Sequence, residues 1–205
     1  MNLATASVHG RFQPFHNGHL EYVLAAKQRC EFLWIGITKY DITQSEFTPL
    51  GRPRERPENN PLTYFERINI ISESLTAAGM EPGNFGFVPF PIETPERLPG
   101  FMPVTMPCLT TVCEEWNREK IKILRRYGYT VSVLWERNQK LVSGGVIREN
   151  IINGGSEWRS MVPAATARAV ELLELRQRLI RLRSLMILKD EPGNLRPDPD
   201  ESDGR

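Results

Sequence analysis

Short apolar runs alternate with amphipathic stretches along most of this chain. Residues 3–8 and 31–38 form two such runs, bounded by polar or small residues, and they predict two buried strands. The residues between them carry apolar side chains at helical spacing, at Leu20, Val23 and Leu24. A strand, a glycine-containing loop, a helix and a second strand form a βαβ unit, which is typical of a parallel sheet.

The same alternation continues downstream. Thr63 and Glu66 have the spacing of a capping box, which predicts the start of a helix that ends at Gly79. Three more strands are expected at residues 85–90, 108–112 and 129–135, and two more helices at residues 114–127 and 143–153. One last long helix is expected from Pro163 to Leu188. The predicted fold class is α/β, a doubly wound parallel sheet of about five strands with a C-terminal helical addition.

The length of 205 residues fits one domain with additions. We expect the main domain at residues 1–155 and a helical extension of the same domain at residues 156–189. Residues 190–205 form an acidic tail that we expect to be disordered. Residues 44–61 are rich in proline and arginine, which predicts a long loop that is either functional or disordered.

The charge balance narrows the choice of partners. The chain has 26 Lys and Arg residues against 25 Asp and Glu residues, a formal net charge of +1. Proteins that bind nucleic acid neutralise many phosphates and are usually basic, so no nucleic-acid partner is expected. A local basic site for one small anion remains compatible with this balance.

Cysteine use and hydropathy indicate the cytoplasm. The cysteines Cys30, Cys108 and Cys113 form no CxxC pair and have no metal-type spacing with the three histidines, which favours reduced thiols. No apolar run approaches the 18 residues of a membrane span, and the N-terminus has no signal-peptide pattern, so no membrane partner is expected. A homo-oligomer is left open.

The segment GRFQPFHNGH, residues 10–19, carries the strongest chemical signal. It lies between the first expected strand and the first expected helix, where open α/β sheets place their ligands. His16 and His19 are three residues apart around a glycine, so both rings can face one side where the helix begins. The amides of that turn favour an anion, and a bound phosphoryl group would also meet two imidazole donors. Such donors can stabilise charge on a pentacoordinate phosphorus without a covalent enzyme intermediate.

Two other interpretations of the histidine pair stay open. The rings can simply cap the helix, or they can bind a metal ion. No neighbouring Cys, Asp or Glu completes a local ligand set. Gly10, Gly18 and the position in the first βα turn favour the phosphate site.

A second segment, VSGGVIR at residues 142–148, supports an anion site independently. Ser143 can cap a helix, and Gly144 and Gly145 let a ligand approach the backbone closely. Arg148 lies one turn into that helix, where its planar guanidinium can contact a phosphate. The alternative is a capped surface helix with a solvated arginine.

These segments together resemble the motifs of a known superfamily. GRFQPFHNGH resembles the HxGH signature of the nucleotidylyltransferases, in the form shown by archaeal-type nicotinamide mononucleotide adenylyltransferases. VSGGVIR resembles the (I/V)SGTxIR motif, and NPLTYFER at residues 60–67 resembles NPFTxxER. Trp158, Val162 and Pro163 fit a W-x-x-x-V-P run. The motifs occur in order over roughly residues 6–175, and the resemblance implies a Rossmann-like sheet.

The resemblance also implies a reaction and a set of residues. A phosphate oxygen of an acceptor attacks the α-phosphorus of a nucleoside triphosphate and pyrophosphate leaves, first of all in adenylyl transfer to a mononucleotide such as nicotinamide mononucleotide. His16, His19 and Arg148 are the implied catalytic residues. Residues implied in nucleotide or phosphate binding are Gly10, Arg11, Phe12, Gln13, Gly18, Ser143, Gly144 and Lys39, of which Lys39 also fits a surface lysine. Mg²⁺ is the implied cofactor, held largely by phosphate and water, and no protein ligand to it is expected.

The acceptor segment departs from the family pattern. Archaeal-type enzymes carry an Asn-x-x-Trp element after the third strand, whereas residues 98–104 here read LPGFMPV. The SGNP segment after the next strand is also missing, and Gly145 stands in place of the motif threonine. The candidates for acceptor binding are Phe101, Trp116 and Arg67. Phe101 could stack on a ring of the acceptor. Trp116 could instead pack in the core, and Arg67 is expected on the surface of a helix rather than at a ligand.

Two alternative functions follow from these departures. The same superfamily includes cytidylyltransferases, which use CTP and a small phosphate or phosphonate acceptor. The arginine-bearing loop 52–56 would suit such an acceptor, or it is simply solvated. A nucleotide-binding regulator without turnover is the other alternative, but it predicts damage to the histidine pair or to Arg148, and all three residues are intact.

Overall fold

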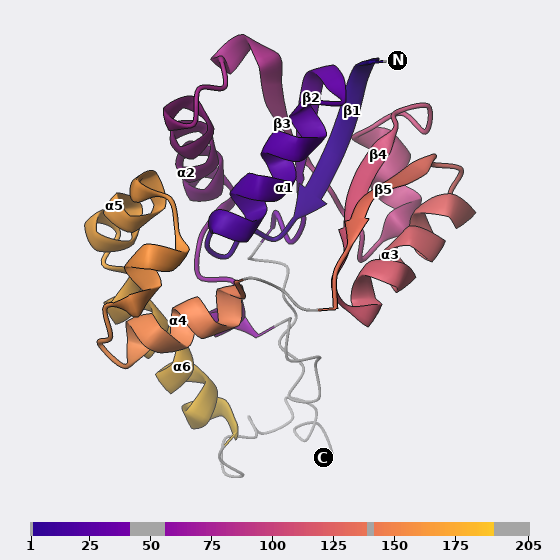
Figure 1. The fold of residues 1–205 in the computed structure, drawn as a ribbon. Coiled ribbons are helices and arrows are strands. Elements are labelled where there is room, and N and C mark those ends of the chain that lie inside the picture. The colour runs from indigo at the N-terminus through magenta and orange to yellow at the C-terminus, as the bar shows by residue number, and fades with distance from the viewer. Residues whose placement is uncertain (1, 42–55, 139–141, 191–205) are drawn as a thin grey trace, which may run out of the picture.

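The computed structural model of the chain describes residues 2–41, 56–138 and 142–190. Its sheet has five strands, all parallel, in the order β3-β2-β1-β4-β5 (Figure 1). The strands are β1 (Leu3–Gly10), β2 (Cys30–Ile37), β3 (Phe85–Pro89), β4 (Cys108–Val112) and β5 (Val131–Glu136). The predicted α/β, Rossmann-like fold is therefore confirmed, and each expected strand is present within a few residues.

Helices connect the strands, as the apolar periodicity predicts. They are α1 (Asn17–Lys27), α2 (Tyr64–Ala77), α3 (Glu115–Arg126), α4 (Gly144–Ile152), α5 (Ala164–Leu172) and α6 (Leu175–Asp190). Short 3₁₀ turns are η2 (Pro57–Asn59), η3 (Pro82–Asn84), η4 (Pro95–Gly100) and η5 (Glu157–Met161). Thr63 and Glu66 form the predicted capping box at α2, and Ser143 caps α4.

The expected single helix from Pro163 to Leu188 is wrong. The chain forms α5 and α6 instead, and Glu174 between them has a φ of 47°. This left-handed backbone cannot continue a right-handed α-helix. Val170 before the break and Leu175 after it are both buried in the core, so the apolar pattern continues across the break and hides it from the sequence.

The strand order fixes where a ligand site can form. From β1 the chain builds the sheet in one direction through β2 and β3, and then returns to add β4 and β5 on the other side of β1. The gap between the carboxyl ends of β1 and β4 is a topological switch point, where ligands bind in sheets of this kind. The loop after Gly10, which carries the first motif, lies at this point.

Two groups of buried apolar side chains pack on the sheet. The larger one joins β1 and β2 to α1, α2 and the C-terminal helices, with Val23, Ile35 and Leu179 among its members. The smaller one joins the crossover after β3 to β4 and α3, with Phe90 and Leu124 among its members. A ligand bound at the switch point therefore lies between two separately packed parts of the molecule.

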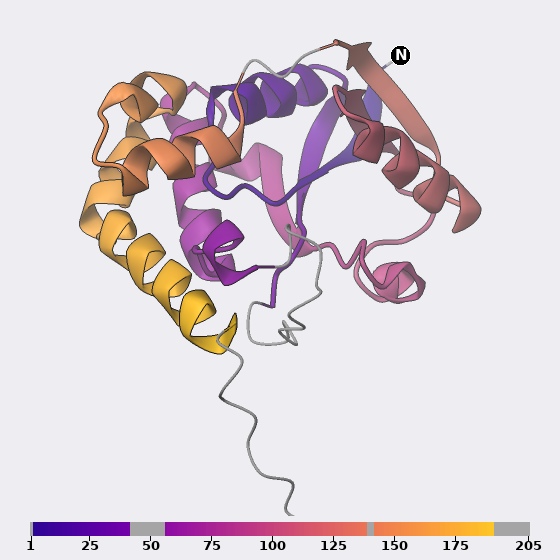
Figure 2. The same cartoon turned by 90° about the horizontal axis from the view of Figure 1, so that it is seen from below.

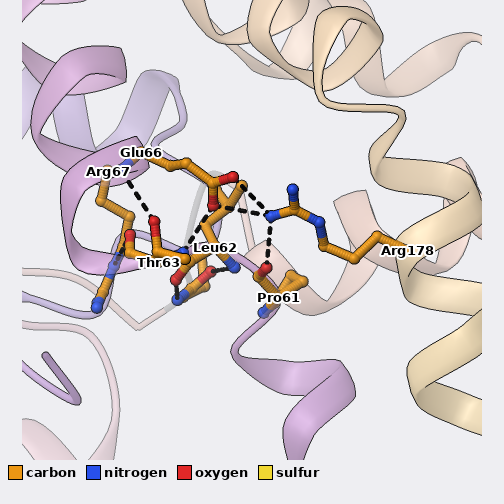
Figure 3. A network of polar contacts seen from close by, with 7 residues as sticks. Pro61, Leu62, Thr63, Glu66, Arg67 and Arg178 are labelled. Atoms are coloured by element: carbon orange, nitrogen blue, oxygen red, sulfur yellow. Dashed lines mark hydrogen bonds and ion pairs between the residues drawn. The ribbon is translucent and has the colours of Figure 1, made fainter. Parts of the chain in front are cut away.

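The C-terminal helices extend the first of these parts. In both views α4, α5 and α6 gather at one side of the molecule, away from α3 and β5 (Figures 1 and 2). Arg178 on α6 donates hydrogen bonds to both carboxylate oxygens of Glu66, each at 2.8 Å, and to the carbonyl of Pro61 (Figure 3). The extension is thus joined to the N-terminus of α2 by a partly buried ion pair.

Some expectations lie outside the described residues. They include most of the loop 44–61, with Arg52 and Arg54, and the tail from residue 191 onward; Asp190 itself ends α6. Within the described part of the chain, no helix has both the length and the apolar character needed to cross a membrane.

Candidate active site

One cavity of about 610 Å³ opens at the switch point. It is bounded by the loop after β1, the start of α1, the ends of β2 and β4, the start of α3 and the start of α4. The residues expected in catalysis or phosphate binding all line it: Gly10, Arg11, Phe12, Gln13, His16, Gly18, His19, Lys39, Ser143, Gly144 and Arg148. Segments 130 residues apart in the sequence thus contribute to one site.

His16 and His19 hold each other in place at the start of α1. The backbone N–H of His19 donates to Nδ1 of His16 at 3.2 Å, and the N–H of His16 donates to Nδ1 of His19 at 3.4 Å. The two rings stack with their centroids 3.5 Å apart. The structure therefore confirms that the histidines cap the helix.

Capping and phosphate binding are compatible uses of these rings. Because Nδ1 of each ring accepts a hydrogen bond, the proton of the neutral imidazole sits on Nε2. Each histidine then carries an Nε2–H donor, and both residues line the cavity. This arrangement provides two donors of fixed orientation for a phosphoryl oxygen.

Arg148 connects the second motif to the first. Its guanidinium donates to the backbone carbonyl of Gln13 at 2.7 Å and to the side-chain oxygen of Asn59. Burial, and then the nearby positive charge of Arg11, lower the pKa of Arg148 to about 10. The site thus holds positive charge that protein anions compensate only in part, which favours an anionic ligand.

Gly144 lets the start of α4 lie directly against the first motif. A Cβ atom at this position would be 2.8 Å from the carbonyl oxygen of Gln13, closer than a side chain allows. The hydroxyl of Ser143 accepts a hydrogen bond from the N–H of Gly145 at 3.3 Å. The glycine is therefore needed for the close approach of these two chain segments.

Gln13 and Phe12 shape the loop between β1 and α1. The side-chain amide of Gln13 makes two hydrogen bonds with the backbone of Leu62, at 2.8 and 3.0 Å. Phe12 has a φ of 53° and a fully buried ring, and the peptide bond between Gln13 and Pro14 is cis. These side chains fix the loop, so their contribution to the cavity comes from the backbone.

Arg67 is not on the helix surface, and that expectation is wrong. The residue is fully buried, and its guanidinium donates to four carbonyl oxygens, of Thr63, Arg11, Thr38 and Lys39, at 2.7 to 3.2 Å. The last three lie in the loops that leave β1 and β2. Arg67 thus joins two loops of the cavity to α2.

The remaining acceptor candidates differ in position. Trp116 lines the cavity at the start of α3, close in sequence to Asn117, which lines it too. Phe101 follows η4, and its ring lies against Tyr40 with the centroids 5.7 Å apart. Phe101 is not one of the described residues that line the cavity.

Several cavity residues were not singled out by the sequence. Glu21 and Arg137 form an ion pair of 2.6 Å at the cavity, and Arg137 also lies over the Trp135 ring. Two more are His9 at the end of β1 and Lys120 on α3, both buried. A histidine at the carboxyl end of a buried strand was a signal for His9, whereas Lys120 lies in a run of charged residues and gave none.

A metal ion bound by the protein alone has little support. In residues 2–41, 56–138 and 142–190 there is no cluster of three or more His, Cys, Asp or Glu side chains placed to hold one. Of the three acidic residues that line the cavity, Glu21 is paired with Arg137, and Glu93 and Glu114 also have interaction partners. The donor set fits a metal that arrives on a triphosphate.

Comparison with known proteins agrees with the motifs. Residues 8–74 match the family model described as cytidylyltransferase-like. The chain is 38% identical over 175 residues to the phosphonoformate cytidylyltransferase of Streptomyces viridochromogenes, covering 85% of this chain and 95% of the relative. It is 27% identical over 180 residues to the nicotinamide-nucleotide adenylyltransferase of Methanococcus aeolicus, covering 86% and 94%.

A solved structure shares the fold. The bifunctional NMN adenylyltransferase/ADP ribose pyrophosphatase of Francisella tularensis, crystallised with AMP and a manganese ion, superposes with a TM-score of 0.65 at 16% identity. The match covers 92% of this chain and 54% of the other, so this chain spans about half of that bifunctional protein. The fold, the motifs at the cavity and these relatives agree: the chain belongs to the cytidylyltransferase-like family and is a nucleotidylyltransferase.

Proposed function

We propose that this nucleotidylyltransferase transfers a nucleoside monophosphate to a small acceptor that carries a phosphate or phosphonate group. An acceptor oxygen forms a bond to the α-phosphorus of the triphosphate. The bond from that phosphorus to the bridging oxygen of the β-phosphate breaks, and pyrophosphate leaves with the electron pair. No covalent enzyme intermediate is needed, because the chemistry depends on positioning and charge stabilisation.

The stacked histidine pair beside Arg148 is the observation that carries this proposal. His16 and His19 with their stacked rings, and Arg148, line one cavity at the starts of α1 and α4. Both helix N-termini direct backbone amides and a positive dipole toward the same space. We assign His16 and His19 to the charge that develops around the α-phosphorus, and Arg148 and Ser143 to the triphosphate.

Mg²⁺ is the proposed metal, held by the triphosphate and water rather than by a protein cage. When bound it would neutralise phosphate charge. The chain's own groups do the remaining work, because His16, His19 and Arg148 orient the phosphates and shield their charge. Lys39, at the end of β2 and on the cavity wall, is a further phosphate ligand in this proposal.

Adenylyl transfer to a mononucleotide is one candidate for the substrate pair. It is supported by the complete first motif and by relatives named nicotinamide-nucleotide adenylyltransferase at 25 to 27% identity. Trp116 at the cavity could stack on a base or a pyridine ring.

Cytidylyl transfer to a small phosphonate is the second candidate, and a specific observation favours it. The relative named phosphonoformate cytidylyltransferase is 38% identical over nearly its whole length. Phe101, which stands in the segment that would hold a pyridine ring, lies against Tyr40 instead. A small acceptor needs no such ring platform.

Pyrophosphate release tests the proposal. Purified protein with Mg²⁺ and either ATP or CTP is offered nicotinamide mononucleotide, phosphonoformate and other phosphorylated acceptors. One pair should release pyrophosphate in equal amount to the product formed. If no pair releases pyrophosphate, the proposed transfer is refuted.

A variant of His16 separates its two uses. Asparagine is a strong N-cap residue, so His16→Asn keeps an acceptor for the start of α1 and removes the Nε2 donor. We expect kcat to fall by about 100-fold or more while the unfolding midpoint in urea stays near that of the wild type. His19→Ala should likewise abolish release, and unchanged turnover in both variants contradicts the assigned role.

A cytoplasmic location belongs to the same proposal. Cys30, Cys108 and Cys113 are all free thiols in the structure, as expected of a protein in a reducing compartment. The substrates proposed for the enzyme are small molecules.

A further inference from the structure

Lys120 is a buried lysine in the wall of the active-site cavity. The residue lies on α3 and is 7% exposed. Within the described residues, its ammonium forms no hydrogen bond and no ion pair. Nζ is not sealed from solvent, so a ligand can reach it from the cavity that the residue lines.

The two ionisable groups that interact with Lys120, on His9 and Cys108, are neutral near pH 7. His9, at 3% exposure, lines the same cavity and stacks on Phe90 with the ring centroids 3.9 Å apart. Burial, and then the positive charge of Lys120, lower the pKa of His9 well below its usual value, so its ring is uncharged near neutral pH. Cys108 is the other ionisable neighbour, and burial raises the pKa of its thiol to about 11. Lys120 is therefore the positive charge of this group.

A purely structural role explains this lysine poorly. Buried cations normally have partners, because an unpaired charge in the interior costs several kcal/mol. Burial lowers the pKa of Lys120 to about 8, which shows the same cost, yet the side chain remains largely protonated at pH 7. An anion that enters the cavity would supply the missing partner.

The position of Lys120 points to the acceptor rather than to the triphosphate. The triphosphate groups, His16, His19 and Arg148, lie at the starts of α1 and α4. Lys120 lies on α3, next to the apolar group formed by the crossover after β3, and Ile92 and Glu93 of that crossover also line the cavity. A nucleobase is uncharged and would leave the ammonium unpaired, and a pyridinium ring would be repelled by it.

We propose that Lys120 binds a second anionic group of the acceptor, so that the acceptor is a small phosphonocarboxylate or a similar molecule with two anionic groups. This inference rests on the proposed function and names its acceptor class. The phosphonate oxygen attacks the α-phosphorus beside the histidine pair, and the carboxylate contacts Nζ of Lys120. The positive charge thus selects an acceptor by the group that does not react.

The test compares two acceptors in matched variants. Phosphonoformate carries a carboxylate and methylphosphonate does not. Lys120→Met removes the charge and keeps the length of the side chain. Lys122→Met, on the same helix with a side chain 71% exposed, is the control for loss of a lysine.

We expect Lys120→Met to raise the KM for phosphonoformate at least tenfold, with the KM for methylphosphonate and for the nucleotide unchanged. Lys122→Met should change none of them. Because the result is a ratio between two acceptors in one protein, partial loss of folded enzyme does not alter it.

Other outcomes overturn the inference. An equal change for both acceptors, no change, or a change in the nucleotide KM alone would show that Lys120 does not bind the carboxylate. Wild-type enzyme that uses only nicotinamide mononucleotide also overturns it, while the proposed transfer stands. If the wild-type enzyme releases no pyrophosphate with any pair of nucleotide and acceptor, the proposed function itself is refuted.

Discussion

Arg67 on α2 and Lys120 on α3 are both positively charged and both buried near the cavity, but their surroundings are opposite. Arg67 donates to four backbone carbonyls from three parts of the chain. Lys120 has no such partner among the described residues. Burial lowers the pKa of both, of Arg67 to about 10 and of Lys120 to about 8.

The difference in partners indicates different roles: Arg67 stabilises the structure of the site, and Lys120 binds a ligand. The carbonyls around Arg67 belong to loops whose backbone forms the cavity, so its charge is used within the fold. The charge of Lys120 is available to an incoming molecule. Burial of a cation is therefore informative only together with its list of partners.

The largest effect is expected from Arg67→Met. The change leaves the carbonyls of Arg11, Thr38 and Lys39 without their donor, so the free energy of unfolding should fall by at least about 3 kcal/mol. Urea denaturation followed by circular dichroism measures it. Arg168→Met, at a pair with Glu73 that is 62% exposed on both sides, is the matched control and should change stability little. Equal losses of stability in the two variants would show that buried Arg67 contributes no more to the fold than an exposed ion pair.

Lys120→Met should change the free energy of unfolding in the opposite direction and stabilise the protein. The folded-state pKa of Lys120 lies below its unfolded value, so protonated Lys120 destabilises the fold below pH 8. The penalty disappears as pH rises toward 10.5, the ordinary pKa. The variant should therefore gain about 2 kcal/mol at pH 7. The gain should shrink at pH 9.5 in paired urea titrations, and a loss of stability at pH 7 would contradict the unpaired state.

Acceptor binding should weaken as Lys120 loses its proton. The KM for phosphonoformate should rise about tenfold per pH unit above pH 8, where the free enzyme carries neutral Lys120. Steady-state kinetics at pH 8 and 9.5 measure the rise, which should be absent in Lys120→Met.

Three of the other titratable groups at the cavity do not explain such a profile, and the thiol of Cys113 lines the cavity as well. The pKa of His9 is lowered far from this range, the pKa of Cys108 is raised to about 11, and burial raises the pKa of Tyr22 further. Carboxylates of Glu93 and Glu114 also line the cavity. A pH profile that is the same in wild type and Lys120→Met would assign the titration to one of these groups or to the substrate.

The smallest effect is expected from Arg178→Met. Its ion pair with Glu66 is partly exposed, with 27% and 17% of the two side chains accessible, so the loss should be about 1 kcal/mol. Glu66 remains bonded to the N–H of Thr63 and keeps the capping box (Figure 3). A loss as large as that of Arg67→Met would mean that docking of α6 supports the cavity loops as much as Arg67 does.

Much of the fold could be predicted because it depends on local pattern. The strands are short apolar runs, and the capping boxes and caps at Thr63 and Ser143 satisfy amides a few residues away. The position of the first motif could also be predicted. The motif follows the first strand of a βα unit, and open α/β sheets bind their ligands at the carboxyl ends of the strands. The division between α5 and α6 could not be predicted, since its apolar pattern is continuous.

The sequence by itself determined the parallel sheet, the histidine pair at the start of α1 and the serine–arginine segment that joins it, because periodicity and spacing are local properties. Only the tertiary structure decided the state of the buried charges. Arg67 has its partners because loops after β1 and β2 converge on α2. Lys120 has none among the described residues, and its ionisable neighbours His9 and Cys108 come from β1 and β4. Burial and pairing depend on contacts between distant segments, which the order of residues along one helix does not contain.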